Sequence, residues 1–301
     1  HPSRIELQVK NLQKNPKRVA NISLSTRLTD RLEAVESNRR LRIGICEPAL
    51  MFRRELVRDK IGYFDNVRKG GDSEFRKRLM KAFDQDCVVV HPFKALTIQR
   101  ADNGGLTQGE LGYRWIAEFR LVYRDSYLYW QRTAGKAQGY RVSSDEQPHF
   151  YSPRQSRMGS AQARSLREFD VVFGVNLRDS KNVPVAVAAI EAAAKLGKSV
   201  GILQLNNLYP LKQPSLIAGK AIQLLNDNKA EMVFAQDEIV ARRFELLAPS
   251  AWLLGSSGQP FDWQISETSV IATDKASEAF IATGQFLSEE LEQSVKNAFR
   301  R

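Results

Sequence analysis

Residues 48–83, PALMFRRELVRDKIGYFDNVRKGGDSEFRKRLMKAF, decide the fold of the first half of this chain. The apolar segment 49–54 is typical of a strand, and the residues after it predict a helix that ends at Gly62. Two glycines followed by acidic residues predict a second helix over 70–83, with Asp72 as its N-cap. We therefore expect strand, helix, loop and helix in this order.

The rest of the first half continues this alternation. Apolar periodicity and β-branched content predict the following elements: a helix over 3–13, a strand over 19–26, a short helix over 27–36, a strand over 87–100 and one long amphipathic helix over 107–132.

The second half begins with FDVVFGVN (169–176), a continuous apolar run of the kind found in buried parallel strands. The pattern then predicts helices over 183–197, 214–228, 237–247 and 287–300, and strands over 199–205, 232–236, 251–256 and 269–274. Strands and helices that alternate over short loops favour a parallel sheet, so we expect a Rossmann-like α/β domain.

Composition and charge divide the chain in a similar place. The 301 residues are 43% hydrophobic and 26% charged, which excludes collagen-like and largely disordered chains. Residues 1–168 carry 32 Lys and Arg against 19 Asp and Glu, whereas residues 169–301 carry 13 against 15. A basic half attracts polyanions and anionic lipids, although a solvated basic surface explains it equally well. We expect a domain over 1–132, a basic linker or arm over 133–168 and a second domain over 169–301.

Several classes of protein are not indicated. Apolar runs are too short to cross a bilayer, so we expect a soluble segment. Cys46 and Cys87 are too few for a disulfide framework and fit a reducing, cytoplasmic compartment. Zinc-finger and RNA-binding motifs are missing, so nucleic acid is not an expected partner. The chain starts at His1 without a signal peptide, and we expect that residues precede it.

Asp72 is the candidate with a chemical interpretation. A carboxylate between a loop and a helix can act as a general base, and arginines such as Arg76 and Arg78 suit a diphosphate. The alternative is structural: Asp72 caps the helix and the arginines are solvated. The residues alone leave both interpretations open.

The run LMFRR…IGYFD.VR.GGDSEF..RL resembles the acceptor-side half of family-two glycosyltransferases with the GT-A fold. The opening HPSRIELQV resembles the segment after the metal-binding Asp-x-Asp of these enzymes, which puts those ligands before His1. The resemblance covers about residues 1–132. It implies inverting transfer of a sugar from a nucleotide-sugar donor to a hydroxyl, with a divalent metal (Mn or Mg) at the donor diphosphate.

The resemblance also implies roles for single residues. Asp72 matches the catalytic base, and Glu74 matches the second acid of that motif. His91 falls where some of these enzymes supply a histidine near the metal, although a strand histidine is commonly structural. Substrate or phosphate binding is expected of five arginines: Arg53, Arg54, Arg76, Arg100 and Arg178.

Residues 169–205 resemble a GT-B or Rossmann-type segment appended to some bacterial polysaccharide glycosyltransferases. We therefore expect a partial GT-A-like mixed-sheet domain followed by a Rossmann-like domain. The expected function is sugar transfer in bacterial envelope or capsule synthesis, onto a polysaccharide or lipid-linked acceptor, with peripheral contact to an anionic membrane at its cytoplasmic face. The alternative is a non-catalytic module that binds glycan or an anionic partner through the basic half.

Overall fold

The computed structural model describes residues 1–35, 43–100, 111–112, 115–143, 149–157, 162, 165–205, 215–247, 249, 251–252, 261, 263–271, 293–295 and 297–299. For residues 91–94, 111–112 and 115 it describes the backbone alone. The chain divides into two compact units, His1–Ser152 and Pro153–Arg301. The predicted α/β class is confirmed, since a mixed four-stranded sheet lies in the first unit and a parallel five-stranded sheet in the second.

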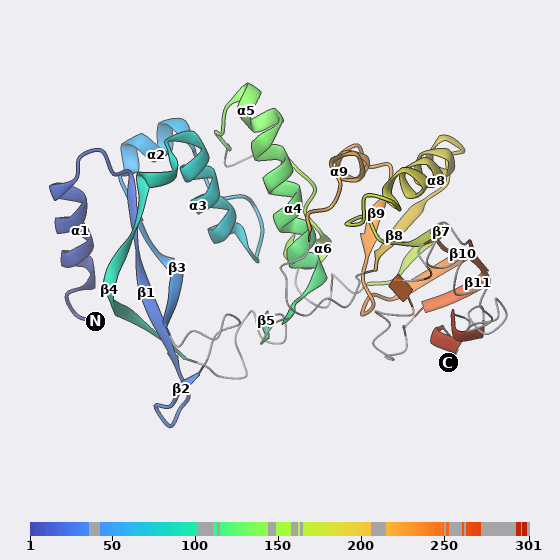
Figure 1. The fold of residues 1–301 in the computed structure, drawn as a ribbon, viewed down its shortest axis with the longest axis horizontal. Coiled ribbons are helices and arrows are strands. Elements are labelled where there is room, and N and C mark those ends of the chain that lie inside the picture. The colour runs from blue at the N-terminus through green and yellow to red at the C-terminus, as the bar shows by residue number, and fades with distance from the viewer. Residues whose placement is uncertain are drawn as a thin grey trace. The chain divides into compact units, whose positions relative to one another are not determined.

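The first unit is built around strand β1. It pairs antiparallel with β2 and β3 and parallel with β4. Figure 1 shows α1 on one side of these strands and α2 and α3 on the other. The elements are α1 (Arg4–Lys14), β1 (Ala20–Leu28), β2 (Ala34–Val35), β3 (Ile43–Phe52), α2 (Arg54–Lys60), α3 (Gly71–Ala82), the 3-10 turn η1 (Gln85–Cys87), β4 (Val88–Arg100), β5 (Leu111–Gly112), β6 (Trp115–Ile116), α4 (Glu118–Arg132) and α5 (Ala134–Gln138).

The apolar core of this unit joins α2 and α3 to the sheet. Phe75 and Leu79 lie one helical turn apart on α3, and both are buried together with Val57 of α2, Ile61 at the C-cap of α2 and Ala20 of β1. Burial of this stripe fixes α3 along the sheet.

The turn after α2 needs a glycine. Gly62 has φ +72°, and a Cβ built there would lie 2.0 Å from the carbonyl oxygen of Val142. The backbone N–H of Tyr63 donates to that same oxygen at 3.0 Å, and the N–H of Val142 donates to the carbonyl of Ile61 at 2.9 Å. The predicted helix end at Gly62 is therefore correct, and the glycine also lets a distant segment pair with the turn.

The second unit holds a parallel sheet in the order β11-β10-β7-β8-β9. The glycine at position 174 on β7 makes room for β10, because a Cβ there would lie 2.7 Å from the Phe244 ring. The elements are α6 (Arg154–Arg157), β7 (Arg167–Val175), α8 (Val183–Lys195), β8 (Val200–Gln204), α9 (Gly219–Asn226), β9 (Glu231–Val233), β10 (Ile239–Leu246) and β11 (Trp263–Val270).

Two helices predicted from periodicity are wrong. The described residues of the helix predicted over 27–36, which are residues 27–35, are not helical, because Arg27 and Leu28 continue β1 and pair with β2. The Thr29 hydroxyl accepts hydrogen bonds from the N–H groups of Arg31 and Glu33, which closes a tight turn instead. The range 237–247 contains β10, because its alternating buried residues complete the parallel sheet.

Two further predictions fail in part. The single helix predicted over 107–132 begins at Glu118, because Ala117 is extended and residues 115–116 pair with 111–112 as a short hairpin. The strand predicted over 251–256 is helical at Ala251 and Trp252, and its remaining residues lie outside the described part. Residues 293–295 and 297–298 are helical within the predicted terminal helix.

The range 133–168, predicted as a linker, contains α5 and α6 and the boundary between the two units. Val142 and Phe150 are buried in a cluster with Tyr127 and Trp130 of α4, so part of the range belongs to the first unit. Within the described residues, helices with the length and apolar composition needed to cross a bilayer are absent.

Substitution of Gly62 by alanine should destabilise the first unit strongly. The new Cβ cannot coexist with the Val142 carbonyl, so the loss of unfolding free energy should exceed the roughly 1–2 kcal/mol that left-handed backbone costs an L-residue. Gly197→Ala is the matched control, since φ there is +71° and a Cβ at that position would have open space within 4 Å. Urea denaturation measures both, and equal losses would contradict the steric account.

Candidate functional site

The start of α3 sets the position of Asp72. Gly70 is the N-cap, with φ +89°, and Asp72 is the second helical residue; the prediction of Asp72 as N-cap is therefore wrong. A Cβ on Gly70 would lie 3.1 Å from the Tyr123 ring of α4. The glycine is required for this close approach, and it brings the first turn of α3 against α4.

A buried ion pair organises the rest of the motif. Arg78 and Glu74 have fully buried side chains, and the Arg78 Nε donates to both Glu74 carboxylate oxygens at 2.9 and 3.2 Å. The Arg78 Nη1 donates to the carbonyl oxygens of Ile61 at 2.8 Å and Tyr140 at 3.3 Å, and Nη2 donates to that of Tyr63 at 2.7 Å. One guanidinium thus joins α3, the turn after α2 and the segment after α5.

The environment of Glu74 does not suit a group that reacts with substrate. Its Oε1 also accepts from the Gln131 Nε2 of α4 at 3.1 Å. Burial raises the pKa of Glu74 above its ordinary value, although the charge and hydrogen bonds of Arg78 act in the opposite direction. With no exposed atoms, this carboxylate serves to position α3 and α4.

Asp65 is a second buried acid of the motif, and it was not among the predicted residues. Its Oδ2 accepts from the Tyr123 hydroxyl at 2.8 Å, and burial raises its pKa. Phe64 beside it stacks on Phe75 with 4.0 Å between ring centroids. The sequence signal is the Phe-Asp pair after the Gly62 turn, which attaches this loop to α3 and α4.

Asp72 differs from these two acids because it stays partly exposed. Its Oδ1 accepts from the backbone N–H of Ser73 at 2.8 Å. One turn later, Arg76 forms a two-fold hydrogen-bonded pair with Glu47 of β3, at 2.8 Å for each bond. Burial alone would lower the pKa of Arg76, but Glu47, with smaller effects of Tyr127 and Asp72, raises it. The structure therefore places a fixed guanidinium beside Asp72.

Within the first unit, Arg53 is used by the fold itself. Arg53 donates from Nη2 to the carbonyl oxygen of Leu12 at 2.6 Å and from Nε to that of Arg18 at 3.0 Å, so it caps the end of α1. Arg54 is exposed at the start of α2. Arg53 and Arg100 lie near opposite ends of β1, about 25 Å apart along the strand.

Three predicted residues remain to be placed. Arg100 forms an exposed ion pair with Asp30 at 2.9 Å. Arg178, in the second unit, donates from Nη1 to the carbonyl oxygen of Ser215. His91 is in β4, and its side chain lies outside the described part of the structure.

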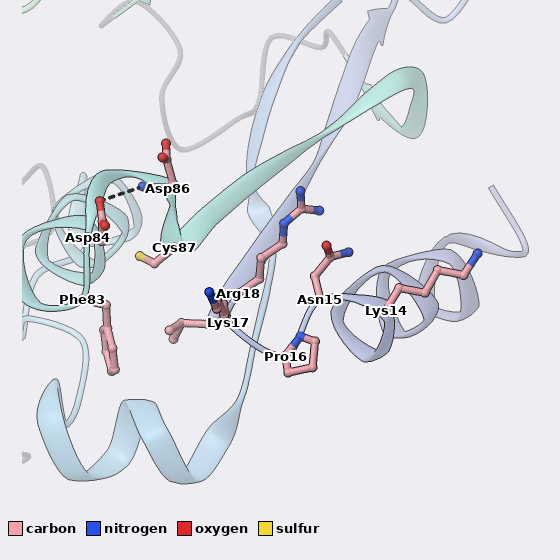
Figure 2. Close-up of a pocket in the computed structure, with 10 residues that line it drawn as sticks. Lys14, Asn15, Pro16, Lys17, Arg18, Phe83, Asp84, Asp86 and Cys87 are labelled. Carbon is pink, nitrogen blue, oxygen red and sulfur yellow. Dashed lines mark hydrogen bonds between the residues drawn. The ribbon is translucent and has the colours of Figure 1, made fainter.

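A cavity of about 550 Å³ lies at the other end of α3. Figure 2 shows its walls: Lys14 is the last residue of α1, Lys17 and Arg18 come from the α1–β1 connection, and Asp84 and Asp86 come from the α3–β4 connection. Along α3, its last residues lie about 15 Å from Asp72. The triplet Asp84-Gln85-Asp86 has Asp-x-Asp spacing, a sequence signal that was not among the predicted residues.

The residues described do not fit a protein-held metal centre. Among them, no group of three or more His, Cys, Asp or Glu side chains is placed to hold an ion. Asp84 and Asp86 supply two carboxylates, but at the end of α3 remote from Asp72. We therefore derive no chemical step through a metal.

No protein-family model matches the sequence, and no curated protein matches it either.

Cys87, at the cavity wall, should be a poor nucleophile at neutral pH. Burial raises the pKa of its thiol to about 11, and the Sγ donates to the Leu79 carbonyl oxygen at 3.5 Å. At pH 8 the thiolate fraction is about 0.1%, against about 25% for a free cysteine. In a Cys46→Ala variant, alkylation by iodoacetamide at pH 8 should be about 250-fold slower than in urea, and its rate should keep rising with pH until about pH 11. A rate that levels off near pH 8.5 would contradict this.

Proposed function

We propose that this chain transfers a sugar from a nucleotide-sugar donor to an acceptor hydroxyl, with Asp72 as the general base. One observation carries the proposal: of the three acids in the motif, Asp65 and Glu74 are consumed by buried hydrogen bonds, whereas Asp72 remains accessible beside Arg76. A base must reach the proton that it removes, and Asp72 meets this requirement.

In the proposed reaction each of these groups has a role. The Asp72 carboxylate accepts the proton of the acceptor hydroxyl while that oxygen forms a bond to the anomeric carbon. The bond from the anomeric carbon to the diphosphate oxygen breaks, and the nucleoside diphosphate leaves with the electron pair. Arg76 lies one helical turn from the base, and Glu47 holds its guanidinium in place through two hydrogen bonds.

Glu74 takes a different role from the one first predicted for it. It acts through Arg78, which holds α3 against the Gly62 turn, and it is therefore a positioning residue in this proposal. Arg53 likewise supports α1 and not a substrate. The substrate roles of Arg54, Arg100 and Arg178 stay predictions of the resemblance.

The finer identity of the fold and its setting belong to the same proposal. We interpret the first unit as the acceptor-side part of a GT-A-like domain and the second as Rossmann-like, in agreement with their mixed and parallel sheets. The divalent metal, the nucleotide sugar, the polysaccharide or lipid-linked acceptor and the place at the inner membrane face rest on the resemblance alone.

The second candidate is a non-catalytic module that binds an anionic partner. The cations Lys14, Lys17 and Arg18 favour it, because they line a cavity away from Asp72. The two candidates differ on whether Asp72 is needed for turnover.

Asp72→Asn should abolish most of the transfer activity while the fold is retained. The amide cannot accept the proton, so turnover should fall by about 10²- to 10⁴-fold. Release of nucleoside diphosphate from a panel of nucleotide sugars and acceptors measures turnover, and circular dichroism measures folding.

Asp59→Asn is the matched control, because Asp59 is an exposed acid on α2 that pairs with Arg58. It should leave turnover unchanged. If Asp72→Asn also turns over like the unsubstituted chain, Asp72 is not the base. The assay uses the full-length protein, because the resemblance puts the metal ligands for the donor before His1. If that protein transfers no sugar from any donor in the panel, the binding-module candidate is favoured.

A further inference from the structure

The cavity at the end of α3 is not used by the proposed reaction. It is lined by Lys14–Val19 on one side and Phe83, Asp84, Asp86 and Cys87 on the other. Its volume of about 550 Å³ lies in the range of small-molecule sites. The distance to Asp72, about 15 Å along α3, makes it a separate place on the first unit.

We call Lys14, Lys17 and Arg18 the basic wall of the cavity, and their charged groups are not paired within the described fold. In the described part of the chain, Lys14, Lys17 and Arg18 form no side-chain ion pair or hydrogen bond. At the end of α1, where such cations commonly cap, the Leu12 carbonyl already accepts from Arg53 and from the Asn15 N–H, and the Asn11 carbonyl accepts from the Asn15 side chain. The three cations therefore remain available for a ligand.

We call Asp84 and Asp86 the acidic wall of the cavity, and their carboxylates are likewise not paired with any cation that the structure places. Asp84 accepts from the N–H of Asp86 at 3.3 Å, and the Asp86 carboxylate meets no cation within the described residues. Among the residues drawn in Figure 2, no nitrogen of the basic wall reaches either carboxylate within the 4.0 Å of an ion pair. Lys17 and Arg18 lie on one side of the cavity and Asp84 and Asp86 on the other.

We propose that this cavity binds a zwitterionic small molecule that carries a phosphate group and a primary ammonium group. The phosphate meets Lys17 and Arg18, and the ammonium meets Asp84 and Asp86. An anion alone would be attracted by Lys17 and Arg18 but repelled by Asp84 and Asp86. A cation alone would be attracted by the two aspartates but repelled by the two basic residues. The inference is independent of the proposed sugar transfer.

The lining also selects the kind of cation. A quaternary ammonium group is recognised by a cage of several aromatic rings. The lining of this cavity contributes the ring of Phe83, and the Lys60 Nζ already lies over that ring, 4.9 Å from its centroid. A primary ammonium instead donates three hydrogen bonds, which the two carboxylates can accept. Phosphoethanolamine is the simplest compound with both groups.

Calorimetric titration of the 301-residue chain at low salt tests the proposal with phosphoethanolamine, inorganic phosphate and ethanolamine as separate probes. Phosphoethanolamine should bind about ten-fold more tightly than either single-charge probe, since it pairs with both walls. Equal or tighter binding of phosphate alone would overturn the proposal.

Two pairs of substitutions should have opposite effects on the binding of inorganic phosphate. Lys17→Gln with Arg18→Gln should weaken phosphoethanolamine and phosphate by about ten-fold. Asp84→Asn with Asp86→Asn should weaken phosphoethanolamine but tighten phosphate, because the repulsive wall is gone. Lys195→Gln and Glu168→Gln, which are exposed in the second unit, serve as controls without effect. If the aspartate pair leaves both ligands unchanged, the acidic wall is not part of a site.

Two further experiments extend the test. The first distinguishes a lipid headgroup from a soluble ligand, and the second tests whether the two aspartates bind a metal ion instead of an ammonium group. Sedimentation with phosphatidylethanolamine vesicles supports the proposal with a lipid headgroup as ligand, and binding of the free compound without vesicle binding supports it with a soluble ligand. Failure of both overturns it. Pyrophosphate with Mg²⁺ that binds more tightly than phosphoethanolamine would also overturn it, because Asp84 and Asp86 would then hold a metal.

Discussion

The buried guanidinium of Arg78 is the constraint on which the first unit depends. It is removed from water with Glu74 and donates to both carboxylate oxygens and to three backbone carbonyl groups. A buried charge that lost its partner would be strongly destabilising, so the pair holds only if α3, the turn at Gly62 and the segment at Tyr140 stay together. The position of the first turn of α3, which carries Asp72, therefore depends on this ion pair.

The same helix separates two chemical environments. At its start, the acids Asp65 and Glu74 are used inside the fold, and Asp72 is left exposed beside Arg76. At its end, residues of two connections form a cavity with opposite charges on its walls. The proposed base and the proposed binding cavity thus lie at opposite ends of one helix, about 15 Å apart, and neither proposed role requires the other.

The sequence predicted the elements whose burial is local. The glycine at 62 marked the end of α2, and the two glycines followed by acidic residues at 70–74 located α3. It could not separate Glu74 from Asp72, because the burial of Glu74 is completed by Gln131, 57 residues away. The segment of β10 fits a helical period nearly as well as an alternating one, and pairing with β7 decides between them. The periodicity of a segment does not predict which distant segment will pack against it.

A double-mutant cycle on Glu74 and Arg78 tests the central claim most directly. Glu74→Met and Arg78→Met should each lower the unfolding free energy of the first unit by about 3–5 kcal/mol, and the double variant should lose clearly less than the sum. Glu6 and Lys10 form an exposed pair with the same helical spacing, and their coupling should be about 0.5 kcal/mol or less. Single losses below about 1 kcal/mol, or strict additivity at Glu74 and Arg78, would contradict the account.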